Sequence, residues 1–168
     1  MKTKKWLIFG LLIVIAIAGC KKKTIDPGPT YYYANAQISG VSKTFKTTSS
    51  FSKFCLPTGV CNTFYTDPAN QNLSLLALWL PVTVKAGVTY TSDSSHTQLL
   101  YIDGNGKYYY SSRGDSLNII VSRWEGHGGT GAGTFSGKLR LQSAKALSDS
   151  IYVKNGTFSS LIWFTIQK

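Results

Sequence analysis

Alternating apolar and polar residues, separated by short turn sequences, dominate most of the chain. The clearest case is residues 134–142, in which every second residue is apolar or glycine. A period of two places successive side chains on opposite faces of a strand, so a half-exposed antiparallel strand is predicted there. No window of a dozen residues shows a helical period. The pattern therefore predicts an all-β protein.

Other segments repeat this pattern between turn signals. Residues 72–80 are apolar on both faces, as expected of a central strand covered on both sides, and Pro81 ends it. Hairpins are predicted about Ser39-Gly40, about residues 103–106 and about Asn155-Gly156. The remaining expected strands are residues 33–38, 41–46, 98–102, 107–110, 116–121, 151–153 and 157–166. Eight to ten short strands favour a two-sheet β-sandwich, with a small β-barrel as the alternative.

The N-terminus has a different pattern, a basic run followed by an apolar one. Lysines at positions 2, 4 and 5 precede 14 apolar or small residues, from Trp6 to Gly19. This is the arrangement of a secretory signal peptide. A helix needs about 20 residues to span a bilayer, so a transmembrane anchor is the minor alternative.

The apolar run ends in Ile17-Ala18-Gly19-Cys20, which resembles the lipobox of bacterial lipoproteins. The resemblance implies cleavage before Cys20 and acylation of its thiol and new amino group, with palmitate as a typical acyl group. Two or three acyl chains hold a protein stably on a membrane, whereas one holds it weakly. We therefore expect residues 1–19 to be removed and Cys20 to be the lipid anchor.

The chain after Cys20 divides into a tether and a domain. Residues 20–30 are polar, with two prolines about a glycine, and are expected to form a flexible tether. Residues 31–168 suit a single domain. The formal net charge of +11 falls to +8 without the signal peptide and to +6 from residue 31 onward. These cations are scattered along the sequence, which speaks against nucleic acid as a partner.

Two cysteines remain once Cys20 is assigned to lipid. Cys55 and Cys61 flank five residues that include Pro57 and Gly59. In an exported protein, such a pair is usually oxidised to a disulfide. Closing so short a loop contributes only about 2–2.5 kcal/mol in the chain-entropy model. We expect this disulfide to shape one turn. No metal site and no cofactor are predicted.

A second resemblance covers residues 85–168. Residues 116–121, the sequence Gly-Thr-Phe-Ser-Gly at 133–137 and residues 153–158 are similar to the C-terminal half of small β-sandwich lipoproteins of the Bacteroidetes. Those families have no known function, so the resemblance implies a lineage and a sandwich fold and no catalytic residues. In that lineage, Asp115-Ser116-Leu117 and Asp149-Ser150-Ile151 would be possible O-glycosylation acceptors.

The candidate binding residues surround a glycine-rich loop and a tyrosine run. A phosphate-binding loop ending in Gly137-Lys138 would need glycine at position 132 and serine or threonine at 139, but the chain has Ala132 and Leu139, and no helix follows. Residues 126–133 are therefore expected to be a mobile hairpin loop. Its neighbours Trp124, Glu125 and His127 are the predicted rim of a ligand site. In the run 108–110, Tyr108 and Tyr110 share one face of a strand, and exposed rings there could stack on sugars.

No catalytic set is evident. Glu125 and His127 could form a base and its orienter, but a nucleophile is missing, and the acids are scattered over turns. Residues 103–106 resemble a calcium loop only superficially. The prediction is a non-catalytic binding domain on the cell envelope, for glycan or peptide. The alternatives are a structural or assembly lipoprotein and, less favoured, a hydrolase. An outer-membrane anchor is expected, facing either the periplasm or the surface.

Overall fold

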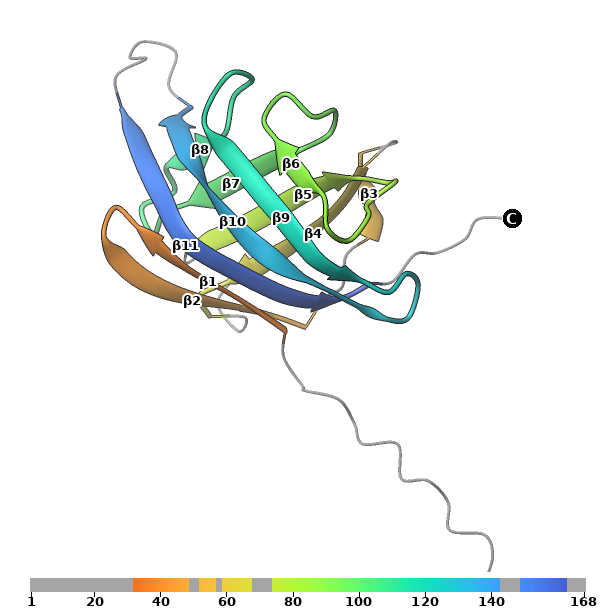
Figure 1. Cartoon of the computed structure of the whole chain (residues 1–168). Coiled ribbons are helices and arrows are strands. Elements are labelled where there is room, and N and C mark those ends of the chain that lie inside the picture. Colours follow the sequence, from red (N-terminus) through yellow and green to blue (C-terminus); the bar gives the residue numbers. More distant parts are fainter. Residues whose placement is uncertain (1–31, 49–51, 57–58, 68–73, 143–148, 163–168) are drawn as a thin grey trace, which may run out of the picture.

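The chain folds into antiparallel β-strands (Figure 1). The computed structural model describes residues 32–48, 52–56, 59–67, 74–142 and 149–162, with no side-chain description for 52–56. No helix in these ranges is long and apolar enough to span a membrane. The all-β prediction is confirmed. The strands are β1 (Tyr32–Ile38), β2 (Val41–Thr47), β3 (Ser52–Leu56), β4 (Gly59–Tyr65), β5 (Leu75–Pro81), β6 (Thr89–Thr91), β7 (Gln98–Ile102), β8 (Tyr108–Tyr110), β9 (Leu117–Trp124), β10 (Thr130–Leu141) and β11 (Ser150–Leu161).

Eight of these strands close into a barrel. They pair in the order β11, β1, β2, β4, β5, β7, β8 and β10, and β10 pairs again with β11. Outside this ring, β3 pairs with β4, β9 with β10, and β6 with β9. The pairing matches the alternative barrel prediction and does not show the two-sheet sandwich, which was also the fold implied by the resemblance over residues 85–168. Alternation is the same in both architectures, and only the pairing of the edge strands distinguishes them.

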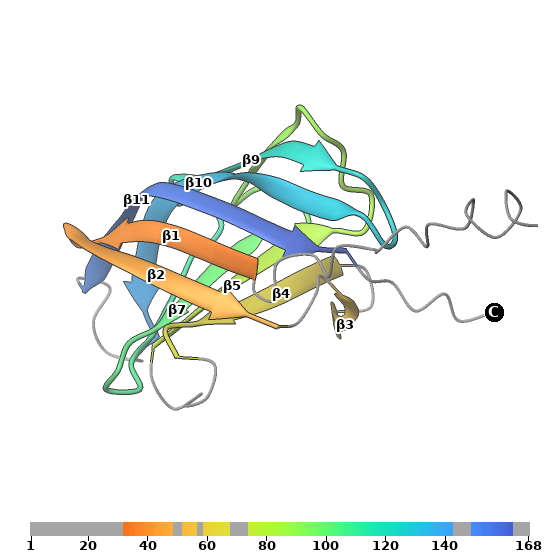
Figure 2. The ribbon, with the colours of Figure 1, turned by 90° about the horizontal axis from the view of Figure 1, so that it is seen from below.

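The ring consists of two walls joined at two short seams. Figures 1 and 2 show β9, β10 and β11 along one wall, with β4, β5 and β7 crossing behind them in another direction. The β2–β4 seam has a single residue pair, Lys46 with Tyr65. The β8–β10 seam has two pairs, one of which joins Tyr110 to Arg140. The ladders inside each wall are longer.

Inward-facing side chains fill the barrel. The fully buried ones include Phe45, Phe64, Leu76, Leu78, Leu80, Leu99, Leu117, Ile119 and Leu139. Each such side chain contributes about 1.5–3 kcal/mol by leaving water. The interior also holds a polar pair, because buried Asn62 of β4 donates a hydrogen bond from its amide to the hydroxyl of Ser160 on β11. The barrel interior is a packed core, and a ligand site has to be sought on its outside or at its ends.

The hairpin predicted about Asn155-Gly156 is wrong, because β11 runs straight through both residues. Asn155 has a positive φ of 51°, and the pairing of β11 with β1 and with β10 shifts register here, which makes the step a β-bulge. A side chain at Gly156 would lie within 2.5 Å of the Phe135 ring. The Asn-Gly signal therefore marks a close approach of two strands and not a chain reversal.

Candidate functional site

The residues predicted as one binding rim lie at two ends of β10. Trp124 pairs with Gly131 near the start of β10, whereas Tyr110 pairs with Arg140 near its end. Nine residues of extended chain separate these positions, or roughly 30 Å. The tryptophan group and the tyrosine group therefore cannot line a single small-ligand site.

The loop of residues 125–129 uses its polar groups internally. The Glu125 carboxylate accepts a hydrogen bond from the Thr130 N–H at 2.7 Å, and Arg123 lies 3.9 Å from its other oxygen. Gly128 donates its N–H to the Ile162 carbonyl, and Ile162 donates in turn to Gly129. Trp124 packs against the core. The predicted bounds of the loop, residues 126–133, are wrong, because β10 already begins at Thr130 and the turn before it is held by these hydrogen bonds.

The tyrosine run on β8 alternates as predicted. Tyr109 packs against the core and stacks on Tyr101, with ring centroids 6.1 Å apart. Tyr108 is 48% exposed, and Tyr110 is half-buried on the same outer face. The turn before the run is held by the Asp103 carboxylate, which accepts the N–H groups of Asn105 and Lys107 at 2.9 Å each. The stacking of Tyr109 and the hydrogen bonds of Asp103 thus fix the position of β8 and of its outer face.

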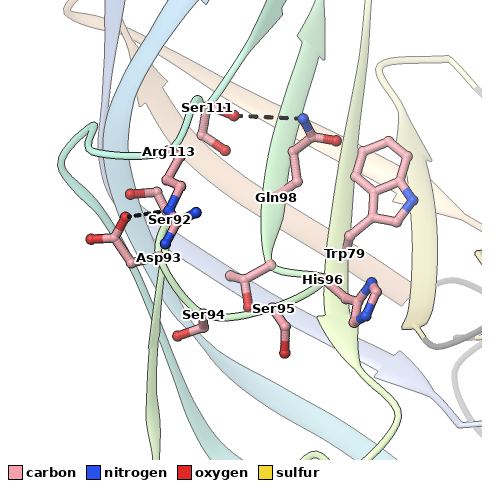
Figure 3. A pocket seen from close by; sticks show the side chains of 10 residues that line it. Trp79, Ser92, Asp93, Ser94, Ser95, His96, Gln98, Ser111 and Arg113 are labelled. Atoms are coloured by element: carbon pink, nitrogen blue, oxygen red, sulfur yellow. Dashed lines mark hydrogen bonds and ion pairs between the residues drawn. The ribbon is translucent and has the colours of Figure 1, made fainter.

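A polar pocket of about 470 Å³ opens elsewhere, beside Trp79 (Figure 3). It lies where the end of β5, the loop of residues 92–97, the start of β7 and the segment after β8 meet. Figure 3 shows Trp79 and His96 on one side, Asp93 with Arg113 on the other, and Gln98 between them. Serine and threonine hydroxyls complete the lining. The residues that line the pocket are Trp79, Ser92, Asp93, Ser94, Ser95, His96, Thr97, Gln98, Ser111 and Arg113.

Some of these polar groups hold the pocket together. Ser94 accepts the Thr91 N–H on its hydroxyl at 3.0 Å, and Ser111 accepts the Leu99 N–H at 2.9 Å. Asp93 accepts the Gly114 N–H at 3.2 Å on one carboxylate oxygen, which also faces the Arg113 guanidinium at 3.8 Å. Two chain segments are thereby tied to each other around the opening.

Other polar groups remain available for a ligand. The second carboxylate oxygen of Asp93 and the amide oxygen of Gln98 have no hydrogen-bond partner among the described residues, and the Arg113 side chain is 89% exposed. Thr97 is only 8% exposed, yet its hydroxyl also lacks a partner within the described part of the chain. A buried hydroxyl without a hydrogen bond costs about 1–3 kcal/mol, so this atom marks a place where a bound polar group would be favourable.

One wall of the pocket is fixed by a buried ion pair. The Asp115 side chain is 1% exposed and accepts hydrogen bonds from the Arg140 guanidinium at 2.6 and 2.8 Å and from the Ser112 N–H at 2.9 Å. The Arg140 hydrogen bond lowers the pKa of Asp115 below its ordinary value, against the opposing effect of burial. Ser92 donates its hydroxyl to the Asp115 carbonyl at 2.6 Å. The ion pair thus links the pocket to β10 across the short β8–β10 seam.

A second hollow of about 370 Å³ lies on the outer face of β9, β10 and β11. Its polar lining consists of side chains such as Asn118, Thr134, Ser136 and Thr157. No charged side chain lines it, and neither does a tryptophan or tyrosine ring. The Trp79 pocket therefore offers the richer set of contacts.

The cysteine and lipid predictions fall largely outside the described side chains. Cys61 on β4 is 3% exposed and disulfide-bonded. Its predicted partner Cys55 belongs to β3, whose side chains lie outside the description, so the pairing stays a prediction. Cys20 also lies outside the described residues. Of the predicted glycosylation acceptors, Ser116 is exposed and Ser150 is half-buried.

The sequence did not reveal the Trp79 pocket. Trp79 stands in an apolar strand, and its alternation with inward Leu78 and Leu80 would have placed it outside the core. The polar run of residues 92–97 between two strands was the other available signal. What joins them is the pairing of Trp79 with Gln98, which is a tertiary fact.

Comparisons with known proteins do not assign the chain to a family. No protein-family model matches the chain, and no significant similarity to a curated protein or to a solved structure was found. The fold and the pocket define the chain only as an antiparallel β-barrel protein with a polar, tryptophan-lined pocket on its outside. Its function has to be argued from the chemistry of that pocket.

Proposed function

We propose that this chain is a lipid-anchored protein of the cell envelope whose barrel binds a glycan, without catalysing a reaction on it, in the pocket beside Trp79. The observation that supports glycan binding is the combination of an indole ring with a buried, unpartnered Thr97 hydroxyl in one cavity. Specific small-molecule sites join apolar surface to a few well-placed polar groups in this way.

Sugar chemistry fits both parts of the pocket. One face of a pyranose ring presents C–H groups, which pack on an aromatic ring such as that of Trp79. Its hydroxyl groups both donate and accept, so they need acceptors such as Asp93 and Gln98 and donors such as Arg113. The pocket offers these groups beside and opposite the indole, with Gln98 between Trp79 and the pair of Asp93 and Arg113. A purely apolar ligand would leave the Thr97 hydroxyl unpartnered.

A binding role fits these contacts better than catalysis does. Glu125 and His127, the pair considered for a hydrolase, lie in the loop where the Glu125 carboxylate already binds Thr130. In the pocket, Asp93 faces Arg113 and is 64% exposed, which suits a hydrogen-bonding group more than a proton donor.

Membrane anchoring is the second part of the proposal and rests on the sequence at residues 17–20. Acylation of Cys20 would attach the barrel to a membrane through the tether of residues 20–30, with the outer membrane as the expected site. Labelling cells with radioactive palmitate tests this. Label should enter the wild-type chain and not a Cys20→Ser variant, and equal labelling of both would overturn the anchor.

Glycan binding is tested with the full chain, purified in detergent, against neutral and acidic polysaccharides immobilised on a surface. Saturable binding to at least one of them is expected. Trp79→Ala should lower the affinity about tenfold or more, equivalent to about 1.4 kcal/mol, while Trp79→Phe should retain most of it because a ring remains. Absence of binding would remove the pocket as a glycan site. So would an affinity that is the same in the wild type and in both Trp79 variants, provided that the melting temperature is also unchanged.

The alternative is a structural or assembly role in the envelope. A protein partner recovered with the chain from membranes, together with no binding to any polysaccharide, would favour it. In that case, substitution of Trp79 should leave the partner bound.

A further inference from the structure

We propose that the ligand is an extended glycan chain and not a single sugar, and that it runs from the Trp79 pocket over the outer face of β7 and β8 across Tyr110 and Tyr108. This inference rests on the proposed glycan site and adds to it the class of ligand, a polymer, and its path. The observation behind it is the outer face of these strands, which is apolar and aromatic although the barrel core lies on the other side.

The register of three strands defines that face. Residues directly paired in an antiparallel ladder point to the same side, and the next pair points to the other. The inward pairs are Leu76 with Tyr101 and Leu78 with Leu99, and all four side chains are buried. The outward pairs are Trp79 with Gln98, Ala77 with Leu100, Leu75 with Ile102, Leu100 with Tyr110 and Ile102 with Tyr108.

This outer face is continuous with the pocket. Gln98 and Ser111 line the pocket, Gln98 lies two residues before Leu100 on the same face of β7, and Ser111 directly follows Tyr110. A chain that leaves the pocket beside Gln98 therefore meets Leu100 and Tyr110 next. The opening of the pocket leads onto an apolar floor.

The spacing of the Trp79, Tyr110 and Tyr108 rings suits an extended glycan chain. Two strand spacings and two residues of rise separate Trp79 from Tyr110, which is roughly 12 Å between Cα atoms. Tyr108 is two residues further along β8, or roughly 7 Å beyond. The rings thus mark a path that crosses from β5 over β7 to Tyr110 on β8 and then follows β8 to Tyr108.

The face is too narrow for a stable protein interface. Of its large apolar side chains, Tyr108 at 48% is the one that is mainly exposed, while Leu75, Leu100, Ile102 and Tyr110 are half-buried. Stable protein partners bury about 800 Å² on each side, around a broad apolar centre. A row of rings with hydroxyl, amide and charged groups at one end instead matches a polymer with apolar ring faces and polar edges.

The test compares ligand length with ring substitutions. The full chain in detergent is titrated with a ladder of oligosaccharides, from the single sugar upward, made from the polysaccharide that binds in the immobilised screen. Affinity should rise with length until the chain spans the three rings. Tyr108→Ala should lower the affinity for the long oligosaccharides about fivefold and leave that for the shortest bound one unchanged.

Two further variants keep the test sharp. Tyr33 on β1 is 47% exposed, almost the same as Tyr108, but lies on another wall of the barrel. Tyr33→Ala should therefore leave every affinity unchanged. Tyr110→Ala removes another ring of the proposed path and should lower the affinity for the long oligosaccharides as Tyr108→Ala does.

The outcomes separate this inference from the proposed function. Affinity that is lost in Trp79→Ala but does not depend on length or on Tyr108 would overturn the extended path and leave a single-sugar site. Equal losses of affinity in Tyr33→Ala and Tyr108→Ala would also overturn it, because the effect of a ring would then not depend on where it lies on the barrel. Absence of all glycan binding would remove both proposals.

Discussion

The loop of residues 92–97 and the loop of residues 125–129 each connect a strand outside the barrel ring to a strand of the ring, β6 to β7 and β9 to β10, and each contains an acid and a histidine. In the second loop, Glu125 binds Thr130, and the backbone of residues 128 and 129 binds Ile162. In the first, Ser92 donates a hydrogen bond to the Asp115 carbonyl and Asp93 accepts one from the Gly114 N–H, which ties the loop to the segment after β8. The Thr97 hydroxyl nevertheless remains without a partner among the described residues. The polar groups of the loop of residues 125–129 are hydrogen-bonded within the fold, whereas the loop of residues 92–97 leaves some of its polar groups for a ligand.

This difference predicts that substitutions in the loop of residues 125–129 lower stability and leave binding unchanged, whereas substitutions of the unpartnered polar groups of the Trp79 pocket lower binding with little or no loss of stability. A residue type that looks functional in the sequence, such as glutamate next to histidine, can thus be structural. The distinction depends on where each polar atom finds its hydrogen-bond partner.

The largest expected effect is that of Gly133→Ala on β10. A Cβ at this position would lie 2.2 Å from the Ile120 carbonyl oxygen and 2.8 Å from the Phe158 ring. Because the first of these atoms is backbone, the strands must separate, and we expect a loss of about 3 kcal/mol or more. Urea denaturation measures it. Gly104→Ala is the control, since its nearest neighbour would be at 3.8 Å, and it should change stability by less than about 0.5 kcal/mol.

The second effect compares two aspartates. Asp115→Asn breaks a pair in which the carboxylate is 1% exposed, so we expect a loss of about 2–3 kcal/mol, reduced from the fully buried case because Arg140 is partly exposed. Asp93→Asn breaks an exposed contact and should cost less than about 0.5 kcal/mol, while weakening glycan binding. Equal costs for the two variants would contradict the assignment of Asp115 as structural and Asp93 as a binding group.

The same pair predicts a pH dependence. The pKa of Asp115 is lowered from 3.8 by Arg140, so its contribution is fully present above that value and is lost as the pH falls through the folded-state pKa below it. The stability difference between wild type and Asp115→Asn should therefore be constant near neutral pH and shrink below about pH 4. A difference that persists unchanged into strong acid would argue against the charged pair.

Much of the fold could be predicted because its signals are local. The expected strand at residues 98–102 agrees with β7, and the turn at Ser39-Gly40 agrees with the hairpin between β1 and β2. Alternation and turn residues act within a few positions, so the sequence reveals them. Closure of the barrel is not local, because it depends on a one-residue seam between β2 and β4 and on the seam from β8 to β10.

The site was harder to predict for the same reason. The sequence places Trp79, residues 92–97 and Arg113 in three separate segments. The pairing of Trp79 with Gln98 and the hydrogen bond between Asp93 and Gly114 bring them to one pocket. By contrast, Trp124, Glu125 and His127 are adjacent in the chain, and this adjacency favoured them. The sequence shows which residues are neighbours along the chain, but it does not show which polar groups already have hydrogen-bond partners in the fold.

A smaller effect is expected for Glu125→Gln in the glycine-rich loop. The amide oxygen of glutamine can still accept the Thr130 N–H, but it loses the charge that strengthens this bond and that faces Arg123. We expect a loss of about 0.5–1 kcal/mol in thermal or urea unfolding. Glycan affinity should stay at the wild-type value, and a large loss of affinity would return this loop to the list of candidate sites.

A change of similar size and of the opposite sign is expected for Thr97→Val. Valine has nearly the same shape, and it removes a buried hydroxyl that has no partner among the described residues, so unfolding should cost about 0.5–1 kcal/mol more than in the wild type. Ser160→Ala is the matched control, because that buried hydroxyl binds both Asn62 and the Leu161 carbonyl, and its removal should cost about 1–2 kcal/mol. Glycan affinity of Thr97→Val should nevertheless fall about fivefold, since the bound sugar would lose one hydrogen bond worth about 1 kcal/mol. A variant that gains stability while it loses affinity identifies a hydroxyl kept for a ligand, whereas a loss of stability like that of Ser160→Ala would show that Thr97 serves the fold.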